Sequence, residues 1–148
     1  MHSDKYISPS STRATIKKII QKIIPHLPCV LINVGTGRLY DRAAQASLIE
    51  SSPIFKELVS STTIRKDYVR IKREVRQYFR YVMFSHRWEH NEPPFQEVVN
   101  MSVYDLEESP THDKLKMFCK IAQGGGFNWA WSDTCCINKA DHFVLQER

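Results

Sequence analysis

Two polar clusters, each directly after an apolar run, hold the side chains of this sequence that are best suited to chemistry. The first is SHRWEH at residues 85–90, and the second is DTCCIN at residues 133–138. Imidazoles, thiols and carboxylates serve in proteins as nucleophiles, as general acids and bases, and as metal ligands. The clusters therefore raise three questions: whether they bind a metal, whether a cysteine is a nucleophile, and what the carboxylate does.

The spacing of the thiols and imidazoles argues against a metal site. The four cysteines, at positions 29, 119, 135 and 136, form no CxxC pair, and His86 and His90 stand four residues apart in a loop. Neighbouring Cys135 and Cys136 on a strand would point to opposite faces. We therefore expect no metal and free thiols, as in a reducing cytoplasm or nucleus, and of these a cytoplasmic location. A nucleophilic cysteine paired with His86 remains an alternative.

The elements around the two clusters should bring them together. Residues 81–84 (YVMF) are a continuous apolar run typical of a buried strand, and residues 128–137 indicate a second strand. Between them we expect a helix over 112–123. Its start signals are Ser109, Pro110 and Asp113, and the glycines at 124–126 terminate it. A strand–helix–strand crossover makes the two strands parallel, so both clusters leave the sheet at the same edge.

Alternation along the second strand places Asp133 on the same face as Trp129 and Trp131. We expect this face to be buried. Burial of a carboxylate costs free energy unless it is paired or hydrogen-bonded, and Arg87 or nearby backbone amides are the expected partners. The residue types alone favour a structural Asp133 that ties two loops together over a catalytic one.

Length and charge limit the other possibilities. The chain has 148 residues, about one domain, and a net charge of +5. Residues 1–80 hold fifteen Lys/Arg against six Asp/Glu, and residues 81–148 hold six against ten. Without an aromatic ladder or a nucleic-acid motif, this basic half indicates solvated helix faces, and we expect no nucleic-acid partner. No apolar run approaches the ~20 residues that span a bilayer.

The sequence divides into three regions. Residues 1–14 are polar and are expected to be a disordered tail. Residues 15–79 should form a helical region, which starts with an amphipathic helix and includes a hairpin near 29–40 turning at Gly35-Thr36-Gly37. Docking of that basic helix on a membrane or a partner groove is the less favoured alternative to packing on its own domain. Residues 80–148 hold the two clusters.

The two clusters together resemble the heterokaryon incompatibility (HET) domain of filamentous fungi. Its first motif is an apolar strand followed by Ser, an aromatic residue, a variable residue and Trp-Gly; Ser85 and Trp88 match it. Its second is Trp, a hydrophobic residue, Asp-x-x-Cys-Ile-Asn-Gln and then Glu-Arg. The matching residues here are Trp131, Asp133, Cys136, Ile137, Asn138, Glu147 and Arg148. The departures are His86 for Tyr, Glu89 for Gly and Lys139 for Gln.

The resemblance covers residues 80–148 and implies an α/β fold, part of a flavodoxin-like or TIR-like parallel sheet. It implies self/non-self recognition and programmed cell death signalling, with proteins of such a pathway as partners and possible self-assembly. The binding or motif residues are then Ser85, Arg87, Trp88, Trp131, Asp133, Cys136 and Asn138.

The resemblance also leaves two alternatives for activity. Some TIR relatives hydrolyse NAD with a glutamate after a third strand, a position expected beyond Arg148, and Glu147 precedes that strand. We therefore expect a truncated domain with no cofactor, for which NAD is at most a substrate. The alternatives are an NAD glycohydrolase whose catalytic part is missing, or an inactive fragment.

Overall fold

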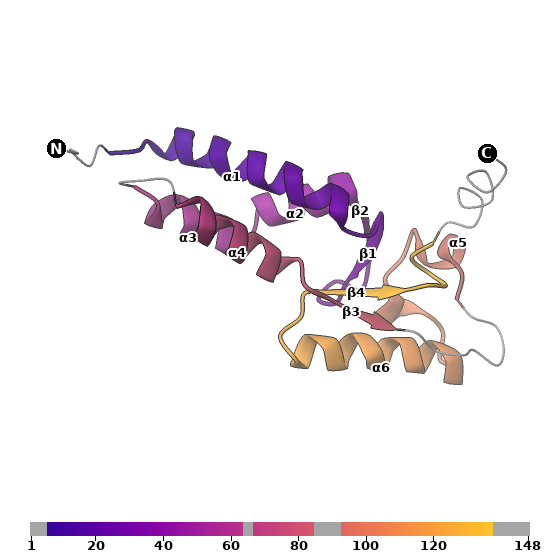
Figure 1. Ribbon diagram of the computed structural model, residues 1–148. Coiled ribbons are helices and arrows are strands. Elements are labelled where there is room, and N and C mark those ends of the chain that lie inside the picture. The colour runs from indigo at the N-terminus through magenta and orange to yellow at the C-terminus, as the bar shows by residue number, and fades with distance from the viewer. Residues whose placement is uncertain (1–5, 64–66, 85–92, 138–148) are drawn as a thin grey trace, which may run out of the picture. The chain divides into compact units, whose positions relative to one another are not determined.

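The computed structural model describes residues 6–63, 67–84 and 93–137, and the chain divides into two compact units (Figure 1). The helical unit comprises residues 1–27 and 42–79, and the sheet unit comprises residues 28–41 and 80–148. The chain thus leaves the helical unit after residue 27, forms a hairpin in the sheet unit, and returns.

Capping residues define where the helices of the helical unit begin. The unit contains α1 (Pro9–Ile23), η1 (Ile24–His26), α2 (Arg42–Glu50), α3 (Pro53–Ser61) and α4 (Tyr68–Tyr78). Ser8 caps α1 by accepting a hydrogen bond from the Ser11 amide (3.2 Å), with Pro9 at the first helical position. The expected disordered tail over residues 1–14 is therefore wrong from Pro9 onward, because Ser8-Pro9 is a helix start.

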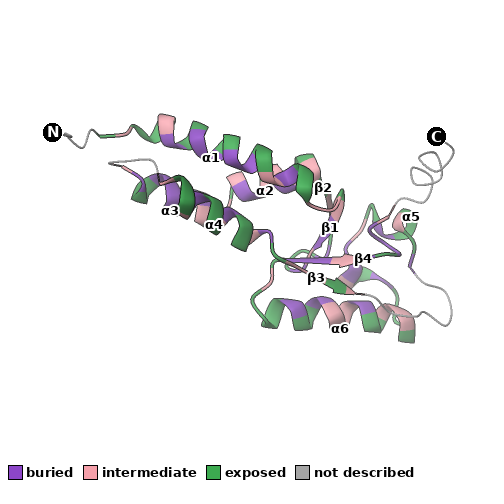
Figure 2. Cartoon of the chain, viewed as in Figure 1, coloured by how far each residue is buried: buried purple, intermediate pink, exposed green. Residues whose placement is uncertain are grey.

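The helical unit has its own apolar interior. On α1, Ile16, Ile19 and Ile20 are buried, as the spacing of three and four residues predicts. The helix packs against α3 and α4, whose buried residues include Leu58, Ile71 and Val75. Figure 2 shows the buried positions recurring between exposed ones along α1. The basic residues of this helix thus lie on its solvent face.

The sheet unit is a mixed α/β structure. Its strands are β1 (Val30–Asn33), β2 (Leu39–Asp41), β3 (Tyr81–Phe84) and β4 (Trp129–Ser132), in the order β2-β1-β4-β3. Its helices are α5 (Phe95–Val98), η2 (Val103–Asp105) and α6 (Pro110–Gly124). The Ser109 hydroxyl accepts from the His112 amide (3.0 Å) at the start of α6, so the predicted cap is confirmed. The β3–β4 pair is parallel, as predicted.

The hairpin belongs to this sheet and not to the helical region where the sequence places it. Strand β1 pairs antiparallel with both β2 and β4, in the registers Leu31↔Tyr40 and Ile32↔Ala130. The sheet is therefore mixed, where a parallel one was expected. The pairing supplies the extra strands that a two-stranded unit needs for stability in water.

The hairpin turn is held by contacts with the segment before α6. Gly37 has a positive φ of 72°, and a Cβ atom there would collide with Ser102 Oγ and the Tyr104 ring. The Ser102 hydroxyl donates to the Thr36 carbonyl oxygen (2.7 Å), and the Tyr104 hydroxyl donates to the Val34 carbonyl oxygen. Only glycine combines this conformation with such a close approach.

The apolar core of the sheet unit joins α6 to the sheet and to η2. It contains Ile32, Val34, Val98, Val103, Leu106, Leu115, Cys119, Ala122, Ala130, Cys135 and Cys136. Leu115, Cys119 and Ala122 are spaced four and three residues apart on α6, and they serve as packing residues on its buried face. Two further cysteines enter the same core from the segment after β4.

Candidate functional site

The two polar clusters follow neighbouring strands that end side by side. Phe84, the last residue of β3, pairs with Ser132, the last residue of β4. Figure 1 shows α6 running alongside β3 and β4 within the sheet unit. The predicted crossover and the predicted common edge are thus confirmed up to the ends of the two strands.

The second strand is shorter than the sequence predicts, since β4 ends at Ser132 instead of residue 137. A tight turn follows, in which the Cys136 amide donates to the Ser132 carbonyl oxygen (3.0 Å). The Ser132 amide donates to Cys136 Sγ (3.3 Å), and the Thr134 amide donates to Ser132 Oγ (3.3 Å). These bonds satisfy backbone groups that would otherwise continue the ladder, so the strand ends without a glycine or proline.

The turn changes the environment of Asp133. Its side chain is exposed, and its Oδ1 accepts a hydrogen bond from the Thr134 hydroxyl (3.3 Å). The expected burial on the Trp129 and Trp131 face is wrong, because strand alternation stops one residue before Asp133. An exposed carboxylate needs no buried partner and is accessible to a ligand or another protein.

The turn also brings Cys135 and Cys136 into the core together, where a strand would have sent them to opposite faces. Both are buried, and a hydrogen bond from the Cys136 thiol lowers the pKa of Cys135. Burial, followed by that same hydrogen bond, raises the pKa of Cys136. On α6, burial and the nearby Cys135 raise the pKa of Cys119 to about 12. All four cysteines are free thiols, and Cys29 is exposed.

Aromatic and apolar side chains surround the ends of β3 and β4. The Phe84 ring stacks on Phe118 of α6, with centroids 4.4 Å apart. Trp131 is half-buried against the core and pairs in register with Met83, whose side chain is 61% exposed. Paired residues lie on the same face of a sheet. That face therefore presents apolar surface next to the strand ends.

The predicted site residues are only partly within the described structure. Trp131, Asp133 and Cys136 lie on the β4 end and its turn, and of these only Asp133 is exposed. Ser85, Arg87, Trp88 and Asn138 lie outside the described residues, as do His86, His90, Glu147 and Arg148. Cys136 is a buried core residue whose amide closes the turn after Ser132.

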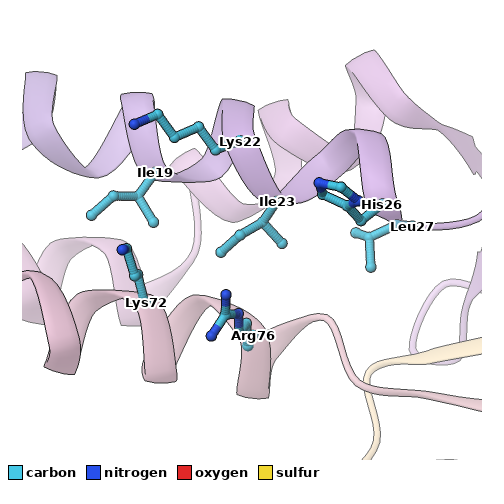
Figure 3. Close-up of a pocket in the computed structure, with 7 residues that line it drawn as sticks. All are labelled: Ile19, Lys22, Ile23, His26, Leu27, Lys72 and Arg76. Carbon is cyan, nitrogen blue, oxygen red and sulfur yellow. The ribbon is translucent and has the colours of Figure 1, made fainter.

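A concave site lies in the helical unit, where the sequence indicates solvated helix faces. A pocket of about 430 Å³ is lined by residues of α1, η1 and α4, together with Leu27 (Figure 3). The lining residues are Ile19, Lys22, Ile23, His26, Leu27, Lys72 and Arg76. A sequence signal for it exists, since Lys72 and Arg76 are four residues apart on one helix face.

Two features are absent from residues 6–63, 67–84 and 93–137: a cluster of metal ligands and a membrane-spanning helix. No group of three or more His, Cys, Asp or Glu side chains there could hold a metal ion. No helix in the same residues combines the length and the apolar character needed to cross a membrane.

Comparisons with known proteins leave the family open. No protein-family model matches the chain, no curated protein matches its sequence, and no solved structure matches its fold. The function must therefore be argued from the geometry of the sheet edge and of the helical pocket.

Proposed function

We propose that the sheet unit is a HET-like module in self/non-self recognition and programmed cell death signalling, acting through the edge where β3 and β4 end. One observation carries the proposal: Phe84 and Ser132, the residues directly before the two polar clusters, are paired neighbours. Segments that are far apart in the sequence thus leave the sheet at one place. Ligands of α/β sheets bind at this edge of parallel strands.

One unit of the fold supports the proposal. The parallel β3–α6–β4 crossover is the unit from which flavodoxin-like and TIR-like sheets are built. The antiparallel hairpin beside β4 would then be an addition in this chain, one that completes the sheet on its other side.

The chemistry of the edge fits recognition. Asp133 offers an exposed carboxylate, and Met83 and Trp131 offer apolar surface on the paired strands. Interfaces combine such apolar centres with polar groups at their rims. We therefore assign regulated association with proteins of a death pathway to this edge, with Ser85, Arg87, Trp88 and Asn138 as further motif residues.

Inducible expression in a filamentous fungus tests this role. The wild-type chain should reduce colony viability, and Asp133→Ala should restore it at equal protein level, because Asp133 is exposed and its loss leaves the core intact. Glu108→Ala is the matched control, since it removes another exposed carboxylate of the sheet unit outside both motifs. A harmless wild type, or an Asp133→Ala variant as toxic as the wild type, contradicts the proposal.

Cellular NAD, measured in the same cultures, separates signalling by association from hydrolysis. Death with an unchanged NAD level is expected. A fall in the NAD level that precedes death and is absent in Asp133→Ala would contradict signalling by association. It would indicate that the module cleaves NAD.

A further inference from the structure

The pocket of the helical unit is cationic on its rim. Lys22, Lys72 and Arg76 line it, and no acidic residue does. In Figure 3, Lys72 and Arg76 extend from α4 toward Ile19 and Ile23 of α1. The two cations are four residues apart, a spacing at which like charges repel across a helix surface. An anion between them would remove this repulsion.

These cations differ from the other basic residues of the same helix. Arg70 pairs with Glu57 (3.0 Å), and Arg73 is 3.8 Å from Glu74. Among the ion pairs of the described residues, none includes Lys22, Lys72 or Arg76. The helical unit as a whole carries thirteen Lys/Arg against five Asp/Glu, so its field also favours an anionic ligand.

The apolar part of the pocket is aliphatic. Ile19 is buried, whereas Ile23 and Leu27 are half-buried and contribute branched hydrocarbon surface. Apart from the His26 imidazole, no ring lines the pocket on which a nucleobase could stack. Hydrocarbon walls below a cationic rim match a ligand with an alkyl tail and an anionic head. The volume of about 430 Å³ is that of a small-molecule site, within the usual ~300–1,000 Å³.

The pocket is held open by contacts of the same unit. Arg42 Nη2 donates to the carbonyl oxygens of Pro25 (3.0 Å) and Leu27 (2.9 Å), which fixes the segment carrying His26 and Leu27. Ile16 and Ile20 on α1 and Ile71 and Val75 on α4 are buried, as expected where two helices pack. A preformed site binds without a large ordering cost.

We propose that this pocket binds a single-chain anionic amphiphile, with its phosphate or carboxylate head between Lys72 and Arg76 and its alkyl tail against Ile19, Ile23 and Leu27. Lys22 of α1 and His26 of η1 also line the pocket. The pocket belongs to the helical unit, whereas the sheet edge belongs to the sheet unit.

Titration of the full chain with decyl phosphate, kept below its micelle concentration, tests the proposal. The methyl resonances of Ile19, Ile23 and Leu27 should shift together. Affinity should be at least about tenfold higher than for inorganic phosphate or for uncharged decyl maltoside. It should also fall as salt is raised, because the head contacts are partly exposed. Equal affinity for decyl maltoside, or for phosphate alone, would overturn the proposal.

Two double variants with the same change in charge localise the binding. Lys72→Glu with Arg76→Glu should weaken decyl phosphate at least about tenfold. Lys17→Glu with Lys18→Glu, at exposed α1 positions outside the pocket, should leave the affinity for decyl phosphate unchanged. Circular dichroism checks that both remain folded, and Lys72→Gln with Arg76→Gln gives a milder second variant. Equal loss in the two charge-reversed proteins would contradict a specific site.

Vesicles distinguish a free amphiphile from a membrane surface. Phosphatidylcholine vesicles with and without phosphatidic acid are mixed with the wild-type chain and separated by sedimentation. The expected result is binding of monomeric decyl phosphate with little retention on either vesicle. Strong retention on the acidic vesicles, with no effect of decyl phosphate on the Ile19 and Ile23 methyl resonances, would contradict a pocket ligand. It would indicate that the helical unit binds a membrane surface instead.

Discussion

Phe84 and Ser132 form the last pair of the parallel ladder between β3 and β4. The crossover through α6 makes this possible, since it returns the chain to the same end of the sheet before the second strand starts. The pair therefore brings the C-terminal ends of the two strands together.

Ser132 should matter more for stability than its neighbour Asp133. Ser132 is 1% exposed, and its hydroxyl accepts from the Thr134 amide, whereas the Asp133 side chain is exposed. Ser132→Ala should therefore lower the free energy of unfolding by ~0.5–1.5 kcal/mol. Asp133→Ala should change it by less than ~0.5 kcal/mol. Urea denaturation of the two variants measures both, and a larger loss for Asp133→Ala would contradict the turn described here.

Gly37→Ala should destabilise the sheet unit. The substitution places a Cβ at a positive φ and against Ser102 and Tyr104, so ~1–3 kcal/mol of stability should be lost. Gly124→Ala is the control, because it lies at the end of α6 with nothing within 4 Å of the added Cβ. It should be neutral or stabilising by up to ~1 kcal/mol. Equal effects of the two substitutions in thermal or urea unfolding would rule out the close approach at Gly37.

Stability should fall in alkaline solution because of Cys119. The folded pKa is about 12 against an ordinary 9.0, so between these values the unfolded chain loses the proton and the folded chain keeps it. The contribution is complete below pH 9 and is lost as the pH rises toward 12, by ~1.4 kcal/mol per pH unit.

Cys119→Ala removes this contribution, so its unfolding free energy should decline less steeply than that of the wild type from pH 9 to pH 11. Cys29→Ala, at an exposed thiol, should follow the wild-type slope. Burial and the Cys119 thiol both raise the pKa of Tyr104, so removal of Cys119 also lessens the alkaline decline through Tyr104, in the same direction. Parallel curves for the wild type and Cys119→Ala would contradict the burial of the thiol.

Thiol labelling should distinguish one cysteine from the other three. Cys29 is exposed, whereas Cys119, Cys135 and Cys136 are buried, so the native chain should react rapidly with Ellman's reagent at a single thiol. All four should react in denaturant. Cys29→Ser should abolish the rapid phase, and rapid reaction of a second thiol in that variant would show that the turn after β4 is open.

Much of the local structure can be predicted from the sequence because its causes are local. The start of α6 at Ser109-Pro110, its apolar stripe and the strand at Tyr81–Phe84 follow from capping, helical spacing and an apolar run. The parallel direction of β3 and β4 also follows, since a crossover helix allows little else. The start of α1 has an equally local signal in Ser8-Pro9, which the polar composition of residues 1–14 conceals.

The remaining features depend on pairings and side-chain bonds that the sequence pattern does not specify. Pairing of Ile32 with Ala130 joins the hairpin to β4, and no property of either segment alone specifies that partner. The end of β4 at Ser132 is decided by bonds from Thr134 and Cys136, which replace the ladder and turn Asp133 outward. The sequence by itself therefore determined which residues adjoin the sheet edge. Only the tertiary structure decided which of them face solvent, because burial depends on packing and backbone pairing across the whole unit.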